Sequence, residues 1–273
     1  MIRDIYSRDA AFQKLQVLKT NRNKRHRYGQ FLVEGVRNLN GAAQNGWEIA
    51  SFVYPRDREL SDWAKGMLRE VRTGENLRLS PELMEELSGK EDTSELMAVV
   101  NMRRGGAGEF RLPEDPLLVL FDRPSNRGNL GTLLRSCDGL GADGLILTGH
   151  GVDLYDPEVV TASMGSFFRV QAAQMERRDV TAYIEELRAS YPGFRTVGTT
   201  AHRQRAVWGE DLSGPVMLML GNETDGLSYG FKQGCDVLCT IPMAEEGSAS
   251  SFNVACAGTV LMYEAVRQRA KRG

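Results

Sequence analysis

The sequence predicts an α/β protein with two domains, the second of which is built on a parallel sheet. Short apolar runs alternate with stretches of helical composition along the chain, and such alternation is typical of a sheet covered by helices. In the second half the runs are almost continuously apolar, as expected for parallel strands buried on both faces. A segment rich in glycine and proline separates the two halves.

The first hundred residues are predicted to form small α/β units. Asn45-Gly46 closes a helix, Pro55 stops a strand, and Ser80-Pro81 supplies an N-cap with proline at the first helical position. The predicted strands are residues 31–33, 49–54, 77–79 and 96–102, and the predicted helices are 35–45, 81–87 and a stretch within 57–71.

The predicted linker lies in residues 103–116, which hold three glycines and two prolines. We therefore expect domains at 1–105 and 117–273, joined by 106–116. The second domain has predicted strands at 117–121, 144–147, 167–170, 194–198, 216–220 and 237–241. Its predicted helices are 130–140, 157–164, 180–190 and a final long one at 253–269.

The composition is that of a globular protein: 273 residues, 41% hydrophobic and 26% charged. No apolar run reaches the length of a membrane span, and the first residues do not begin a signal peptide, so we expect a cytoplasmic location and no membrane partner. The four cysteines form no C-x-x-C pair and there are three histidines. Buried thiols are therefore favoured over disulfides, and no metal site is expected. The cysteines are Cys137, Cys235, Cys239 and Cys256.

The net charge of the chain is -2, but one segment is locally basic. Six Lys or Arg residues lie between Lys19 and Arg37 against one acid, Glu34. Contact with nucleic acid and a solvated helix face are both consistent with this charge alone. The candidate RNA-binding residues within it are Arg22, Lys24, Arg25 and Arg27.

Three short segments of the second half carry polar residues at predicted strand ends. The first, residues 126–135, follows the strand at 117–122, and its glycines let the turn approach a ligand closely. Asn129 and Arg135 are six residues apart, and we expect them over one end of the helix, where a guanidinium can bind a phosphate. A plain strand-turn-helix corner is the alternative.

The second segment is Leu220-Gly221-Asn222-Glu223, and the third runs from Ile241-Pro242-Met243 to Ser250-Ser251-Phe252-Asn253. Taken singly, Glu223 is best explained as a capping residue and the serine-rich turn as an N-cap. The G-x-G-x-x-G fingerprint, the P-loop and the G-x-S-x-G elbow are absent. A nucleotide-dependent oxidoreductase is therefore disfavoured.

In this order and spacing the three segments resemble the motifs of the SpoU/TrmH family of RNA 2'-O-ribose methyltransferases, in the SPOUT class. Asn129 and Arg135 match the first motif, Gly221 and Glu223 the second, and residues 241–243 with 251–253 the third. Phe252 stands where the family usually has leucine, but no polar residue with an assigned role is missing. Residues 31–35 are similar to the start of an RNA-binding domain that resembles a ribosomal protein fold.

The resemblance implies a C-terminal SPOUT domain with a deep trefoil knot, a homodimer formed through the last helix, and S-adenosylmethionine as cofactor. The implied cofactor-binding residues are Gly221, Ile241 and Phe252, with Met243 and Thr199 nearby. The implied catalytic residues are Arg135, Asn129, Glu223, Ser251 and Asn253.

The resemblance also implies that Arg135 acts beside the cofactor of the other subunit. We expect Arg135 to bind a phosphate and stabilise the developing alkoxide rather than to accept a proton, because a guanidinium stays protonated at neutral pH. The expected substrate is a ribose 2'-hydroxyl of structured RNA, of the 23S ribosomal type. A tRNA 2'-O-methyltransferase and a non-catalytic RNA-binding protein are the alternatives.

Overall fold

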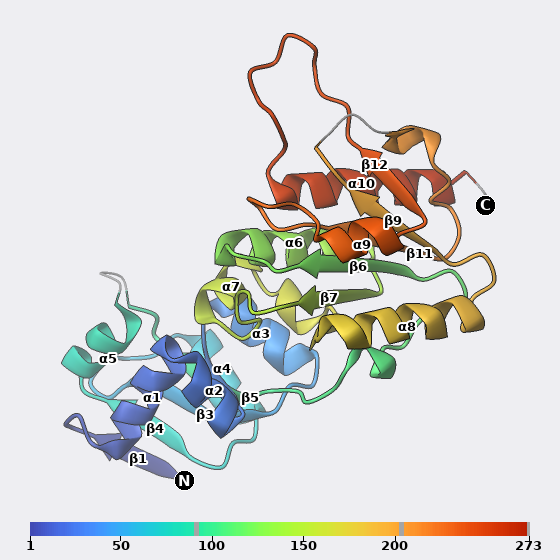
Figure 1. The fold of residues 1–273 in the computed structure, drawn as a ribbon. Coiled ribbons are helices and arrows are strands. Elements are labelled where there is room, and N and C mark those ends of the chain that lie inside the picture. The colour runs from blue at the N-terminus through green and yellow to red at the C-terminus, as the bar shows by residue number, and fades with distance from the viewer. Residues whose placement is uncertain (90–92, 202–204, 272–273) are drawn as a thin grey trace. The chain divides into compact units, whose positions relative to one another are not determined.

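A computed structural model describes residues 1–89, 93–201 and 205–271. The chain divides into two compact units (Figure 1). Unit 1 consists of Met1–Arg103 and Tyr155–Arg169, and unit 2 consists of Arg104–Leu154 and Val170–Gly273. A short segment from the second half of the chain therefore folds with the N-terminal unit.

Unit 1 is built on a five-stranded mixed sheet in the order β1-β4-β3-β5-β2. Strands β1, β4 and β3 run parallel, and β5 is antiparallel to β3 and β2. The strands are β1 Ile2–Ile5, β2 Gln30–Glu34, β3 Ile49–Pro55, β4 Asn76–Leu79 and β5 Met97–Asn101. The helices are α1 Ala10–Thr20, α2 Arg22–Tyr28, α3 Val36–Gln44, α4 Asp62–Glu70 and α5 Pro81–Ser88.

The sequence reading did not predict the first three elements, β1, α1 and α2. Helix α1 buries Phe12, Leu15 and Leu18, which recur every three residues, and Asp9 caps it by accepting from two backbone nitrogens. This spacing and cap are the signals that could have identified α1.

The strand predicted at 167–170 is wrong. These residues contain a 3₁₀ turn, η2 Ser166–Phe168, which follows the short helix α7 Pro157–Ala162. Phe167 and Phe168 are buried in an aromatic cluster with Phe31 and Trp47, and the Trp47 indole donates to the Phe168 carbonyl. The apolar pair thus fills the core of unit 1 instead of entering a strand ladder.

Unit 2 contains a seven-stranded sheet in the order β10-β12-β9-β11-β6-β7-β8, in which every pairing is parallel. The strands are β6 Leu117–Asp122, β7 Gly144–Thr148, β8 Ala172–Met175, β9 Arg195–Thr199, β10 Arg205–Ala206, β11 Val216–Leu220 and β12 Val237–Thr240. The helices are α6 Arg127–Leu140, α8 Arg177–Ser190, α9 Tyr229–Gly234 and α10 Val254–Arg269. All residues of β6, β7 and β11 are buried, which confirms the predicted parallel sheet.

Helices cover both faces of this sheet (Figure 1). Helix α8 packs through Val180 and Ile184 on the face that carries Leu118 and Met217. Helices α6 and α10 pack on each other. A Cβ at Gly258 of α10 would lie 2.6 Å from the Leu133 side chain and 2.8 Å from that of Leu220, so this glycine permits the close packing.

The strand order reverses between β6 and β11. From β6 the chain proceeds to β7 and β8 on one side, while β11, β9, β12 and β10 lie on the other. In open α/β sheets, ligands bind at the carboxyl ends of strands beside such a reversal. Both the 126–135 segment and Glu223 follow these two strand ends.

Part of the predicted linker is packed. Ala107, in the 3₁₀ turn η1 Ala107–Glu109, is buried in the core of unit 2, and Phe110 and Leu112 pack against that core. Apolar side chains thus anchor a segment whose glycines and prolines indicate a loop. The limits of the two domains and the trefoil knot stay predictions.

The four cysteines are free thiols. Cys137 and Cys239 are buried, and burial raises the pKa of each thiol to about 12. The expectation of buried thiols is wrong for Cys256, which is exposed in the first turn of α10. Within the described ranges, no group of three or more His, Cys, Asp or Glu could hold a metal ion. None of the described helices has the length and apolar character needed to cross a bilayer.

Candidate active site

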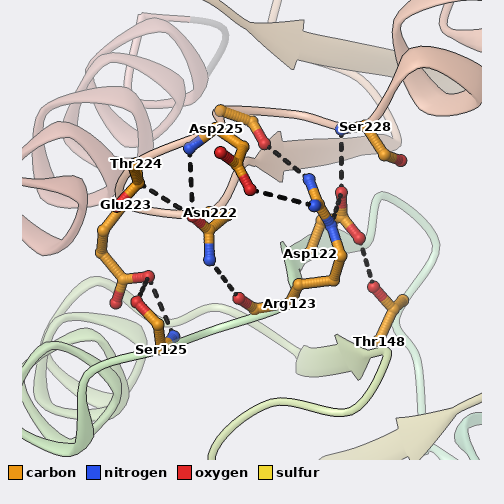
Figure 2. A network of polar contacts seen from close by, with 10 residues as sticks. Asp122, Arg123, Ser125, Thr148, Asn222, Glu223, Thr224, Asp225 and Ser228 are labelled. Carbon is orange, nitrogen blue, oxygen red and sulfur yellow. Dashed lines mark hydrogen bonds and ion pairs between the residues drawn. The ribbon is translucent and has the colours of Figure 1, made fainter.

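Glu223 lies at the reversal point, in the turn after β11, and faces the loop after β6 (Figure 2). Its carboxylate accepts hydrogen bonds from the backbone nitrogen and the hydroxyl of Ser125, at 2.9 and 2.7 Å. It also accepts from the backbone nitrogen of Asn126 at 3.0 Å and from Nδ2 of Asn129 at 3.2 Å. Glu223 therefore holds the entrance of helix α6 against the end of β11.

These hydrogen bonds set the ionisation state of Glu223. Partial burial by itself would raise the pKa of the carboxyl group, but the hydrogen bonds from Ser125 and Asn129 outweigh it, and the pKa is lowered. A carboxylate with a lowered pKa and occupied acceptor sites is a poor proton acceptor at neutral pH. Glu223 is built to hold other groups in place.

Asn129 and Asn253 continue the hydrogen bonding from Glu223. Nδ2 of Asn253 donates to Oδ1 of Asn129 at 2.9 Å. Oδ1 of Asn253 accepts from the backbone nitrogens of Ala255 and Cys256 and caps helix α10. Because a carboxylate only accepts, Glu223 fixes which way the Asn129 amide is turned. We call Glu223, Asn129 and Asn253 the amide relay; it joins residues from all three motif segments.

Arg135 and Ser251 lie apart from the amide relay in this structure. Helix α6 begins at Arg127, so Arg135 is in mid-helix. Six residues at about 1.5 Å of rise separate it from Asn129 by about 9 Å along the axis. The expectation that both lie over one helix end is therefore wrong. Arg135 and Ser251 are exposed, and the side chain of neither forms a hydrogen bond or ion pair with the residues that the structure describes.

Three of the five candidate cofactor residues lie side by side at the carboxyl edge of the sheet. Thr199 ends β9, Gly221 follows β11 and Ile241 follows β12, and β9 pairs with both neighbours. The Thr199 hydroxyl donates to the Met219 carbonyl at 2.9 Å. A Cβ at Gly221 would collide with the backbone of Gly226 and Leu227, so this position requires glycine.

Met243 and Phe252 lie in the loop between β12 and α10, which projects from the sheet in Figure 1. Met243 is half-buried and Phe252 is 44% exposed. The apolar Ile241 and the bare backbone of Gly221 at the edge of the parallel sheet suit the adenosyl part of a cofactor. The residues present therefore fit S-adenosylmethionine.

Sequence reasoning missed the polar residues behind Glu223 that Figure 2 displays. Asp122 is 2% exposed and accepts from Ser228 and Thr148. Arg123 has a φ of 54° and bonds to the turn that carries Glu223. An aspartate at the end of an apolar strand was the available signal for Asp122.

The four candidate RNA-binding residues of the basic segment lie in helix α2, and one of them is not available to RNA. Arg25 is 2% exposed and pairs with Asp156 at 3.2 Å. Its guanidinium also donates to the carbonyls of Leu18 and Lys19. The prediction that Arg25 contacts RNA is therefore wrong, because its guanidinium is buried and bound to Asp156 and to two backbone carbonyls. Arg27 is exposed, and Arg22 and Lys24 are half-buried.

Comparisons with known proteins identify the family of this chain. The family model described as the SpoU rRNA Methylase family matches residues 116–263, more than half of the chain. The chain belongs to this SpoU methylase family. A second model, the SpoU L30e-like domain, matches residues 9–98. The family and the α/β fold class predicted from the sequence are confirmed.

The SpoU methylase has full-length relatives. It is 45% identical over 269 residues to the 23S rRNA (uridine(2479)-2'-O)-methyltransferase of Streptomyces viridochromogenes, covering 98% of this chain and 93% of that protein. The crystal structure of the SpoU methyltransferase AviRb from Streptomyces viridochromogenes with the cofactor AdoMet superposes with a TM-score of 0.91 at 45% identity, over 96% of this chain and 99% of that one.

A third similar protein is the AdoMet-bound rRNA methyltransferase from Sinorhizobium meliloti. Its TM-score is 0.86 at 26% identity, over 97% of this chain and 98% of that one. The predicted enzyme class, an RNA methyltransferase that uses S-adenosylmethionine, is confirmed by the family and by these relatives.

Proposed function

We propose that this SpoU methylase transfers a methyl group from S-adenosylmethionine to a ribose 2'-hydroxyl of 23S-type ribosomal RNA. The observation that carries the proposal is the amide relay, which brings residues of three separate motif segments into one row of hydrogen bonds. The full-length relative that acts on 23S rRNA supports the choice of substrate. A ribosomal substrate also supports the expected cytoplasmic location.

Each of the candidate side chains has a different proposed role in such a transfer. When bound, S-adenosylmethionine supplies a methyl group already activated by a sulfonium. Arg135, exposed on α6, would bind the phosphate beside the target ribose and stabilise the developing alkoxide. Glu223, Asn129 and Asn253 would hold the reacting groups in line, and positioning supplies much of the rate in such reactions. Ser251 is proposed to join them when RNA is bound.

Unit 1 is proposed to bind the RNA. Arg22, Lys24 and Arg27 of helix α2 would contact phosphates, since they carry the unburied positive charge of that helix. Exposed Tyr28 ends the helix and could stack on an unpaired base. The match of residues 9–98 to an L30e-like domain supports this assignment.

A homodimer formed through α6 and α10 is part of the proposal. These helices present an apolar groove in which Val260 is 39% exposed and Tyr263 58%. Neighbouring exposed apolar side chains mark contact surfaces. A second copy of the chain, related by a two-fold axis, would cover this groove with the same surface of its own α6 and α10. Ser136 of α6 lines the groove one position from Arg135. A dimer formed there would bring the stretch of α6 that carries Arg135 close to the other subunit.

The proposal is tested with the purified protein, S-adenosylmethionine labelled in its methyl group, and transcripts of 23S rRNA, 16S rRNA and tRNA. We expect label in 23S rRNA alone, recovered after alkaline hydrolysis as a resistant dinucleotide, which marks a 2'-O-methyl group. Label in tRNA would support the tRNA alternative. Binding of RNA without any transfer would support the non-catalytic alternative.

A further inference from the structure

Two loops of unit 2 hold each other at both ends. The first loop is residues 123–126, after β6, and the second loop is residues 222–226, after β11. From the second loop, Glu223 reaches Ser125 and Asn126 of the first loop. From the first loop, Arg123 reaches Gly226 and Asp225 of the second loop (Figure 2). We call this pair of reciprocal contacts the clasp.

The Arg123 half of the clasp uses both backbone and side chain. The Arg123 guanidinium donates to the Gly226 carbonyl at 3.0 Å and lies 3.6 Å from the Asp225 carboxylate. The Arg123 carbonyl accepts from Nδ2 of Asn222 at 2.7 Å. Oδ1 of Asn222 in turn accepts from the backbone nitrogens of Thr224 and Asp225. Arg123 thus binds the first and last residues of the second loop.

A buried carboxylate anchors this half. Nε of Arg123 donates to Asp122 at 3.2 Å, and Asp122 is 2% exposed. Asp122 also accepts from the Thr148 hydroxyl at 2.7 Å and from the Ser228 backbone nitrogen at 2.9 Å. The guanidinium therefore links the second loop to a fixed point on the sheet.

The backbone at Arg123 is unusual for a residue with a Cβ. Its φ of 54° lies in the left-handed region, where glycine is favoured and other residues are strained. A Cβ at Gly149 would lie 2.7 Å from Cγ of Arg123, so that glycine leaves room for the arginine stem. The contacts of the guanidinium offset the strain of an arginine in a position suited to glycine.

We propose that Arg123 is a positioning residue for methyl transfer, and that it acts by holding Glu223 and hence the amide relay in place. The proposal rests on the function proposed above. With the Arg123 side chain removed, the second loop keeps its internal hydrogen bonds and the bond from Asn222 to the carbonyl of residue 123, but Gly226 and Asp225 lose the guanidinium that links them to Asp122. Glu223 then no longer presents a fixed carboxylate to Asn129.

The first experiment compares Arg123→Gly with the wild type and with Arg188→Ala. Glycine relieves the strained φ and removes the side chain, but it keeps the backbone carbonyl that accepts from Asn222. Arg188 is a matched control, because its guanidinium also pairs with an aspartate, Asp236, at 2.9 Å on a partly exposed surface of the same unit. We expect Arg123→Gly to lower kcat about tenfold to a hundredfold, with KM for RNA nearly unchanged and an unaltered Tm. Arg188→Ala should keep the wild-type kcat.

Two further variants separate positioning from a general structural role. If Arg123 acts through Glu223, the double variant Arg123→Gly/Glu223→Gln should be no slower than Glu223→Gln alone. Arg123→Lys should recover only part of the rate, because an ammonium cannot fork between Asp122 and Gly226. Rate losses that multiply in the double variant, or a wild-type kcat in Arg123→Gly, would overturn the proposal.

Amide hydrogen exchange tests the clasp without any activity. We expect faster exchange at the Ser125 and Asn126 amides in Arg123→Gly than in the wild type, and wild-type exchange at both in Arg188→Ala. Unchanged exchange in Arg123→Gly overturns the clasp. A wild type that transfers no methyl group, with the exchange difference present, would instead contradict the proposed function alone.

Discussion

Nδ2 of Asn253 donates a hydrogen bond of 2.9 Å to Oδ1 of Asn129, and the two residues are 124 positions apart in the chain. Asn253 is the N-cap of α10, and Asn129 lies in the first turn of α6. One hydrogen bond therefore ties the starts of two packed helices together, directly beside Glu223. Asn253 therefore both caps α10 and helps to orient the Asn129 amide.

The Asn253→Asp variant separates the capping of α10 by residue 253 from its hydrogen bond to Asn129 in the amide relay. Aspartate keeps the acceptor for the first turn of α10, but it loses the Nδ2 donor and places a carboxylate against Oδ1 of Asn129. We expect an unchanged or slightly raised Tm and a methyl transfer rate at least about tenfold lower. Calorimetry and a single-turnover assay measure the two effects. Asn253→Ala is the comparison, since it should lose about 1 kcal/mol of stability as well.

The stabilising effect of Glu223 should depend on pH. The folded-state pKa is lowered from the ordinary value of 4.5, so the ionised form is favoured by folding. The contribution is therefore complete above about pH 4.5 and is lost as the pH falls through the folded-state pKa. We expect the stability difference between the wild type and Glu223→Gln, measured by urea unfolding, to shrink as the pH is lowered from 7 toward 3. A difference that grows on acidification would contradict the assignment.

The buried pair Arg25–Asp156 should stabilise unit 1. Arg25→Met leaves the Asp156 carboxylate without its buried guanidinium partner, which is expected to lower the free energy of unfolding by about 3–5 kcal/mol. Adding Asp156→Asn, which preserves an oxygen to cap α7, should recover part of this loss. Chemical unfolding measures both variants. A loss below about 0.5 kcal/mol in Arg25→Met, typical of exposed sites, would refute the buried role.

The basic helix α2 should govern RNA affinity. A triple alanine variant of Arg22, Lys24 and Arg27 is expected to weaken binding and to reduce the slope of log affinity against log salt by about 0.7–0.9 for each lost phosphate contact. Binding of S-adenosylmethionine, measured by calorimetry, should be unaltered. The control replaces three basic residues of another surface of unit 1, namely Lys65, Arg69 and Arg72. Equal losses in both variants would mean that only net charge matters.

The groove on α6 and α10 should control assembly. Tyr263→Glu places a charge in the proposed interface and is expected to shift the protein toward monomers in sedimentation experiments. Tyr229→Glu is the matched control, because Tyr229 of α9 is also an exposed tyrosine, at 78%. If Tyr263→Glu keeps the mass of the wild type, the interface is elsewhere.

The fold class was predictable because its signals are local. Apolar runs such as 117–121 and 216–220 identify buried parallel strands, and turn residues such as Ser80-Pro81 mark element starts. Local signals predicted the wrong element where packing between residues far apart in the chain decides the structure. Phe167 and Phe168 have the composition of a strand, yet they pack with Phe31 and Trp47 in unit 1.

By itself the sequence determined most strands of the parallel sheet and the family, and it singled out Asn129, Glu223 and Asn253 as candidates, because short-range patterns and motifs encode them. Only the tertiary structure decided which polar atoms meet. Arg25 pairs with Asp156 across 131 positions, and Arg123 reaches Gly226 across 103. The first contact depends on how α2 packs beside the start of α7. The second depends on strand order, since the parallel strands β6 and β11 bring their carboxyl ends to one edge however far apart they lie in the chain.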